Sequence, residues 1–140
     1  MKNFRALLAF VLVFTILAGV PAALAATERS SQFYSSVYAD VDKLDSGVAE
    51  VSFTVTGLHR MKMIGVKEIK VCNSSGGALK HIYYTDSGYS NLMSSNKITY
   101  ASKAKFTVPS GHEYYLVVYF YVKDSYGAST KPFITGSFSA

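Results

Sequence analysis

Apolar and polar residues alternate with a period of two along most of the chain, a pattern typical of β-strands that bury one face. The alternation is unbroken at residues 51–56, which read VSFTVT, and Gly47 and Gly57 punctuate the ends of this segment. We therefore predict a half-buried antiparallel strand there. A less regular alternation over residues 34–42 predicts a strand before it.

The next segment keeps the strand pattern but changes its phase. Its apolar residues shift parity after Val66, and a β-bulge or a bend at Lys67 and Glu68 would keep them all on one face. The sequence NSSGG at residues 73–77 then predicts a hairpin loop, and residues 78–85 predict the returning strand.

The middle of the chain interrupts the strand pattern. Residues 86–96 contain no alternation, so we expect a surface loop with one helical turn that carries Leu92 and Met93 into the core. Two short β segments are expected after this loop, at residues 97–100 and 105–108.

The strongest strand signal covers residues 114–122, where both faces are apolar or aromatic. The even-numbered positions share one face, and Tyr115, Val117, Tyr119 and Tyr121 share the other. A strand without a polar face is expected at the centre of a sheet, with a second layer on one side and semi-polar tyrosines on the other.

The end of the chain completes an all-β pattern. Residues 124–127 predict a turn, and residues 128–139 predict a last strand in which Pro132 suits an edge position. About seven strands with frequent turn signals predict a single antiparallel β-sandwich, immunoglobulin-like or fibronectin type III-like. An up-and-down barrel is the alternative, although seven strands of unequal length close less naturally than eight.

The beginning of the chain has the pattern of a secretory signal peptide. Two positive charges precede an apolar stretch at residues 6–20, and Ala-Leu-Ala at residues 23–25 offers the small-residue motif that signal peptidase needs. We predict cleavage after Ala25, so that residues 1–25 are removed and residues 26–140 form the secreted β-sandwich domain. An uncleaved N-terminal anchor helix is the alternative.

Composition agrees with a folded domain outside the cell. Of the 140 residues, 49% are hydrophobic and 16% are charged, which excludes a disordered chain. The net charge is +5, but the lysines are spread through strand-like segments, so we expect no nucleic-acid partner. No apolar stretch that could span a membrane follows the signal peptide. The expected location is therefore the medium, or the cell surface through non-covalent attachment.

Cys72 is the only cysteine, so no internal disulfide can form and the core alone must stabilise the domain. Its parity points away from the core, and we predict a partly exposed structural cysteine. Whether it is free or forms an intermolecular disulfide stays open. His81 is a conceivable base for a nucleophilic role, but a regular hairpin pairs Cys72 near Leu79 and places His81 near position 70.

No motif indicates catalysis, a cofactor or a metal site. His59, His81 and His112 lack ligand spacing, and the chain has no nucleophile elbow, phosphate-binding loop or calcium-binding loop. We expect isolated surface histidines. Three acidic residues near the start of the domain are expected to form a solvated edge: Asp40, Asp42 and Asp45.

Tyrosine is the one unusual feature of the composition, with eleven tyrosines and no tryptophan. Tyr115, Tyr119 and Tyr121 share a strand face and are the candidate ligand-binding residues. Each ring offers an apolar face and a hydrogen-bonding edge, so such a platform can stack on sugar rings or receive a peptide. The alternative is that these tyrosines only cover the outer face of the sheet, because tyrosine is favoured in strands.

The sequence PSGHEY at residues 109–114, together with the alternating strand that follows it, resembles the E–F turn and F strand of fibronectin type III domains. In those domains a glycine precedes a tyrosine that pins the corner, so the resemblance implies a tyrosine corner at Tyr114. The tryptophan that the family places on an early strand is missing here.

A second resemblance covers most of the domain. The signal peptide, the sequence YTDSGY at residues 84–89 and the tyrosine-rich strand are similar to small secreted β proteins of Gram-positive bacteria, a family of unknown function. This resemblance implies a bacterial secreted β protein and assigns no chemistry.

These observations predict a non-catalytic extracellular or cell-surface binding module without a cofactor. Contact would run through the tyrosines or through the loop at residues 86–96, with a cell-envelope or host glycan or another extracellular protein as the partner. The alternatives are a small secreted inhibitor or toxin-like protein, which would show a rigid exposed loop, and a hydrolase, which would show a pocket with two ionisable groups. The oligomeric state stays open.

Overall fold

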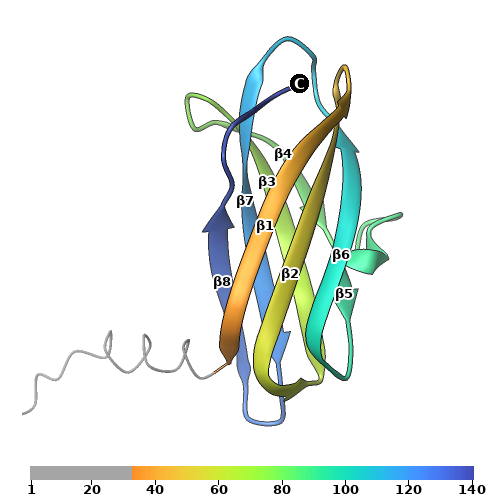
Figure 1. Ribbon diagram of the computed structural model, residues 1–140, viewed down its shortest axis with the longest axis vertical. Helices are drawn as coiled ribbons and strands as arrows, with labels where there is room; N and C mark the ends of the chain where they lie inside the picture. Colours follow the sequence, from red (N-terminus) through yellow and green to blue (C-terminus); the bar gives the residue numbers. More distant parts are fainter. Residues whose placement is uncertain (1–32) are drawn as a thin grey trace, which may run out of the picture.

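The computed structural model describes residues 33–140, so the predicted signal peptide and its cleavage site lie outside the described residues. The described part is a β-sandwich of two antiparallel sheets, which run along the long axis of the molecule in two layers (Figure 1). The strands are β1 (Tyr34–Asp45), β2 (Val48–Met61), β3 (Met63–Asn73), β4 (Ala78–Tyr83), β5 (Met93–Ser94), β6 (Lys97–Thr107), β7 (Glu113–Lys123), β8 (Ala128–Ile134) and β9 (Phe138–Ser139).

The strand order is immunoglobulin-like. Sheet A has the order β1-β2-β6, and sheet B has the order β4-β3-β7-β8, with β5 pairing β3 and β9 pairing β7. Counted over the seven long strands, the first, second and fifth (β1, β2 and β6) form sheet A, and the third, sixth and seventh (β3, β7 and β8) lie in sheet B. Immunoglobulin-type sandwiches divide their strands in the same way. The fourth long strand, β4, joins sheet B. The prediction of an all-β sandwich with about seven strands is confirmed, since seven strands are long and two have only two residues.

The core lies between the sheets and is built by the alternation read from the sequence. The even-numbered side chains of β7 from Tyr114 to Val122 point inward and are buried, as are Val51, Phe53 and Val55 of β2. Phe53 and Phe120 meet edge to face across the core, with ring centroids 6.1 Å apart. Because β7 lies between β3 and β8, its position at the centre of sheet B is confirmed.

The predicted change of phase in β3 is a β-bulge. The register of β3 against β7 shifts between Val66 and Glu68, which leaves Lys67 as the extra residue. The predicted helical turn is also present, as a 3₁₀ turn at Ser90–Leu92 that buries Leu92 completely. This turn passes so close to β3 that a Cβ atom on Gly65 would lie 2.2 Å from the carbonyl oxygen of Leu92.

The prediction of two short segments at residues 97–100 and 105–108 is wrong. A single strand, β6, pairs with β2 from Lys97 to Thr107. The residues between the predicted segments, Ala101 to Ala104, are small or polar and carry little hydrophobic signal. Their backbone nevertheless completes the ladder, because β2 offers an unpaired edge along its whole length.

The predicted last strand is divided in two. Thr135 interrupts the ladder after β8, because its side-chain oxygen accepts a hydrogen bond from the backbone N–H of Leu116 at 3.0 Å. The chain resumes pairing with β7 only at β9. Pro132 lies on β8, which is an edge strand of sheet B, as predicted.

Two buried tyrosine hydroxyls tie distant parts of the sandwich together. Tyr114 donates a hydrogen bond to the carbonyl oxygen of Pro109 at 2.7 Å, the geometry of a tyrosine corner. The Tyr34 hydroxyl lies 3.0 Å from the carbonyl oxygen of Phe120 and 2.6 Å from that of Ser129, so it links β1 to sheet B. Burial raises the pKa of Tyr34, which keeps this hydroxyl protonated as a donor.

Replacing Tyr114→Phe is expected to lower the free energy of unfolding by about 1 kcal/mol, because it removes one side-chain hydrogen bond and leaves the ring packing intact. Urea denaturation monitored by circular dichroism measures the change. The control is Tyr126→Phe, since Tyr126 is 93% exposed and its hydroxyl supports no contact. Equal stability of the Tyr114→Phe variant and the unaltered protein would contradict the structural role of this corner.

Candidate functional site

The outer face of sheet B carries the three tyrosines selected from the sequence. Tyr115, Tyr119 and Tyr121 project from the central strand β7, on the side opposite the core, and each is half-buried. The side chains around them come from all four long strands of the sheet. We call this surface the tyrosine face; it consists of Tyr115, Tyr119 and Tyr121 of β7, Lys67, Glu68 and Lys70 of β3, His81 and Tyr83 of β4, and Thr130, Pro132 and Ile134 of β8.

Two lysines lie over two of the tyrosine rings. The Nζ atom of Lys67 is 5.7 Å from the ring centroid of Tyr121, and the Nζ atom of Lys70 is 5.7 Å from that of Tyr119. Both distances are within the range of cation–π attraction. Hydrogen bonding and electrostatic attraction from Tyr119 raise the pKa of Lys70 above its ordinary value, so this lysine keeps its charge at neutral pH.

Tyr115 has a different environment from the other two. It lies opposite Cys72 in the β3–β7 ladder, and Cys72 is only 2% exposed. Burial, followed by a hydrogen bond with Cys72, raises the pKa of Tyr115. The prediction of a partly exposed Cys72 is therefore wrong: the thiol points away from the core as its parity indicates, but it is a free, buried cysteine beneath the outer side chains.

The β4 side of the tyrosine face contains a histidine–carboxylate pair. His81 Nδ1 lies 2.6 Å from Glu68 Oε1, and the His81 ring stacks on Tyr83 with centroids 6.3 Å apart. The predicted pairing of His81 with position 70 is confirmed, and Cys72 pairs with Ala78. His81 therefore serves Glu68 as a partner and is not placed to activate the thiol.

The β8 side of the tyrosine face is apolar and exposed. Pro132 lies opposite Tyr119 in the ladder, and Ile134 lies opposite Val117 with 67% of its surface exposed. Cross-strand neighbours on one side of a sheet are in contact distance of one another. The rings of β7 are thus bordered by charge on the β3 side and by an exposed apolar rim on the β8 side.

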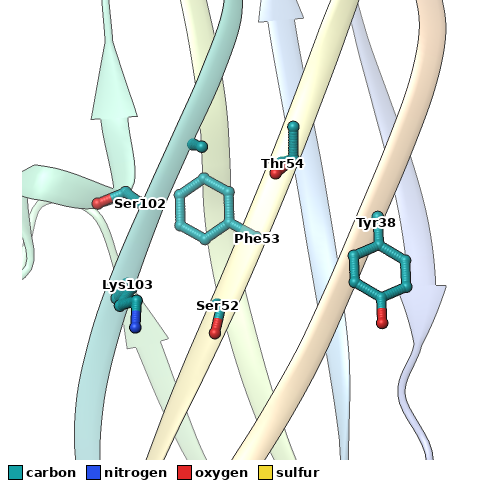
Figure 2. Close-up of a pocket in the computed structure, with 7 residues that line it drawn as sticks. Tyr38, Ser52, Phe53, Thr54, Ser102 and Lys103 are labelled. Carbon is teal, nitrogen blue, oxygen red and sulfur yellow. The ribbon is translucent and has the colours of Figure 1, made fainter.

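The outer face of sheet A has a different character. It contains a shallow hollow of about 310 Å³ in which small side chains of β2 lie between Tyr38 of β1 and Lys103 of β6 (Figure 2). Asp40 and Asp42 are exposed beside it on β1, which confirms their predicted solvation, and Lys103 pairs with Glu50 at 3.2 Å. The residues that line the hollow are Tyr38, Ser52, Phe53, Thr54, Ala101, Ser102 and Lys103.

The loop at residues 86–96, the other predicted contact segment, is fastened to β6. Tyr89 donates a hydrogen bond to the carbonyl oxygen of Lys105 at 3.0 Å, and Asn91 donates one to that of Lys103 at 2.6 Å. The Tyr100 hydroxyl donates in return to the carbonyl oxygen of Asn91. The loop is therefore held against the edge of sheet A, and Asp86 at its start accepts a hydrogen bond from the backbone N–H of Tyr83 at 2.8 Å, at the β4 edge of the tyrosine face.

The turn between β7 and β8 forms a rigid tip at the lower end of the molecule in Figure 1. Asp124 Oδ1 accepts hydrogen bonds from the backbone N–H groups of Tyr126 at 2.7 Å and Gly127 at 3.0 Å. Asp124 Oδ2 lies 2.7 Å from His59 Nε2, which belongs to β2. The carboxylate is buried by these partners, whereas Tyr126 at the tip is 93% exposed.

Burial alone would raise the pKa of Asp124, but the backbone N–H of Tyr126, then His59 and the backbone N–H of Gly127, outweigh it and hold the pKa below its ordinary value of 3.8. A carboxyl whose folded pKa is lowered stabilises the fold above its unfolded pKa. That contribution is lost as the pH falls through the folded pKa.

We therefore expect the Asp124→Asn variant to melt at a lower temperature than the unaltered protein at neutral pH. This difference in melting temperature should disappear as the pH falls below about 4. The variant keeps an oxygen acceptor for the turn but loses the charge that faces His59. Thermal melts across the pH range measure this difference. Asp42→Asn, which removes an exposed carboxylate, is the control, and a difference of constant size down to low pH would contradict the assignment.

In the described part of the chain, two ionisable side chains, His112 and Glu113, line a hollow of about 280 Å³ beside the β3–β4 turn. His59 and His81 each pair with a carboxylate in separate places, and His112 lies by Tyr114 with ring centroids 6.4 Å apart. Within residues 33–140, no group of three His, Cys, Asp or Glu side chains could hold a metal ion. The same residues contain no helix that is long and apolar enough to cross a membrane.

Comparison with known proteins adds no assignment: no protein-family model matches the chain, and no curated protein matches it.

The tyrosines could be found from the sequence, but their partners could not. The parity of β7 predicts that three rings share one face, and the structure places them so. The positions of Lys67 and Lys70 over the rings depend on the bulge, which shifts β3 by one residue against β7. The hollow on sheet A and the pairing of His59 with Asp124 join residues far apart in the chain, and no local signal marks them.

Proposed function

We propose that this protein is a secreted, non-catalytic binding module of bacterial origin that attaches to a surface outside the cell through its tyrosine face. The observation that carries the proposal is the position of Tyr119 and Tyr121. They are neighbours on the outer side of the central strand of sheet B, half-exposed, with exposed apolar residues on one side and lysines on the other.

The chemistry of this surface suits a glycan or another extended ligand. Tyr119 and Tyr121 are two residues apart on a strand, so their side chains emerge about 7 Å apart on the same face. A ring presents an apolar side for stacking and a hydroxyl for hydrogen bonding, and it loses little conformational entropy when a ligand binds. The four long strands of sheet B hold both rings at fixed positions, which supports repeated contacts along an extended ligand.

The side chains that surround the tyrosine face favour binding over catalysis. The ionisable groups of this face are lysines over rings and one histidine–carboxylate pair, and none is aimed into a cavity. The hollow on sheet A lies on the opposite side of the sandwich, and the hollow lined by His112 and Glu113 lies beside the β3–β4 turn. A hydrolase would need a concave site in which two such groups act together, and His112 and Glu113 form no ion pair with each other.

Replacing Tyr119→Ser and Tyr121→Ser together is expected to reduce binding to insoluble cell-wall material by about tenfold or more, because two stacking rings are removed from the contact. Co-sedimentation of the secreted protein with purified walls measures the bound fraction. The melting temperature should change by only a few degrees, since both side chains lie outside the core.

The matched control removes two tyrosines from other places, Tyr38→Ser and Tyr126→Ser. Tyr38 is 58% exposed beside sheet A, and Tyr126 is 93% exposed at the tip. Equal loss of binding in the two double variants would show that tyrosine content, and not the tyrosine face, governs attachment. No pelleting of the unaltered protein would reject a wall-binding module altogether.

A second candidate function, that of a secreted inhibitor or toxin-like protein directed at a soluble partner, is favoured by the tip between β7 and β8. An exposed tyrosine on a turn that is already rigid loses little entropy on binding, which is the property of an inhibitory loop. Asp124 provides this rigidity, and Tyr126 is the exposed residue.

Tyr126→Ala separates the two candidates. If the protein is an inhibitor, this change should abolish capture of a soluble extracellular protein, because a central tyrosine anchor commonly contributes more than tenfold to affinity. If the tyrosine face carries the function, the fraction of the Tyr126→Ala variant that pellets with cell walls should equal that of the unaltered protein. Pull-down from culture medium and wall co-sedimentation, run on the same two proteins, give the answer.

A further inference from the structure

We propose that the ligand of the tyrosine face is an acidic polysaccharide, whose sugar rings contact Tyr119 and Tyr121 while its acid groups pair with Lys67 and Lys70. This inference rests on the proposed function and adds the chemical class of the ligand. It follows from two observations: the two sheets present different charges to the solvent, and the lysines of sheet B lie beside the exposed rings.

The charge of the outer face of sheet B is basic. Lys67, Lys70 and Lys123 point outward from β3 and β7. The acidic side chains on the same face are Glu68, whose carboxylate lies 2.6 Å from His81 Nδ1, and Glu113, which is exposed at the start of β7. Three ammonium groups therefore face the solvent against two carboxylates, one of which already has a partner.

The outer face of sheet A shows the opposite balance. Asp40, Asp42 and Glu50 lie on β1 and β2, against Lys103 and Lys105 on β6. Because Lys103 pairs with Glu50 at 3.2 Å, the two exposed aspartates dominate one edge of this face. An anionic polymer is therefore drawn to sheet B rather than sheet A.

The geometry on sheet B brings an acid-binding group and a sugar-binding group together twice. Each lysine Nζ lies 5.7 Å from the centroid of a tyrosine ring, once at Tyr121 and once at Tyr119. A sugar that contacts the exposed part of a ring would hold a carboxylate or phosphate substituent within reach of the adjacent ammonium. Lysine is protonated over the pH range in which such polymers are anionic, and Tyr119 raises the pKa of Lys70 further.

An uncharged glycan would use the rings alone and leave these lysines without a function. A charged polymer without sugar rings would contact the lysines alone, and salt would screen the attraction between the opposite charges efficiently. Because each exposed ring has a lysine beside it, we expect a ligand whose repeating unit carries both a sugar ring and an acid group. Carboxylate-bearing and phosphate-bearing polysaccharides share this chemistry, and the experiment tests each source separately.

Binding is measured on the secreted protein by affinity electrophoresis with matched pairs of polymers. Polygalacturonate is compared with fully methyl-esterified pectin, and phosphorylated mannan with unmodified mannan. Polyacrylate supplies charge without sugar. We expect at least one acidic polysaccharide to bind about tenfold more tightly than its neutral counterpart, a difference of about 1.4 kcal/mol. Binding should also exceed that of polyacrylate at about 1 M salt, where screening extends only about 3 Å.

The variant Lys67→Ser/Lys70→Ser tests the assignment of the acid-binding groups. It should weaken binding to the acidic polysaccharide about tenfold and bring its affinity close to that for the neutral polymer. The matched control is Lys103→Ser/Lys105→Ser, which removes two lysines at alternate positions of sheet A and should change the affinity less than twofold. Circular dichroism melts establish that both variants are folded.

The outcomes separate this inference from the proposed function. Equal affinity for acidic and neutral polymers, or equal losses in the two lysine variants, overturns the acidic ligand. If wall binding still depends on Tyr119 and Tyr121 in that case, the binding module stands with a neutral or protein ligand. If wall binding does not depend on those tyrosines, both proposals fail.

Discussion

The packing of β7 is the constraint on which the rest of the structure depends. This strand carries apolar or aromatic side chains on both faces, so neither face can be left fully exposed without cost. Its inward side chains, from Tyr114 to Val122, form the middle of the core, and β3 and β8 satisfy its backbone on both sides. The outward tyrosines are then held at the centre of a sheet, half-covered by the side chains of its neighbours.

This half-covered state links the stability of the fold to the proposed function. Tyr115 is used structurally, because it covers Cys72 beside the β3–β4 hairpin. Lys70 lies over Tyr119 and Lys67 over Tyr121, and these flexible side chains can move when a ligand arrives. Lysines over the rings shield an aromatic surface from water while the site is empty. In the proposed complex, the same lysines pair with the acid groups of the ligand.

Much of the fold could be predicted because its strands alternate cleanly. The strands at residues 51–56 and 114–122, the bulge near Lys67 and the buried turn at Leu92 all follow from local patterns. Strand β6 could not be predicted as one element, because its middle is small and polar and is held by the open edge of β2. The exposure of Cys72 was predicted wrongly for a related reason: parity gives the direction of a side chain but not what lies over it.

The sequence by itself determined that the chain forms a β-sandwich and that three tyrosines share the outer side of its central strand, because a period of two is a local property of the backbone. The tertiary structure alone decided which tyrosines meet lysines, where Asp124 finds His59, and which sheet face is basic. These relations join strands that are distant in the chain. They depend on strand order and register, and alternation along a single strand carries no information about either.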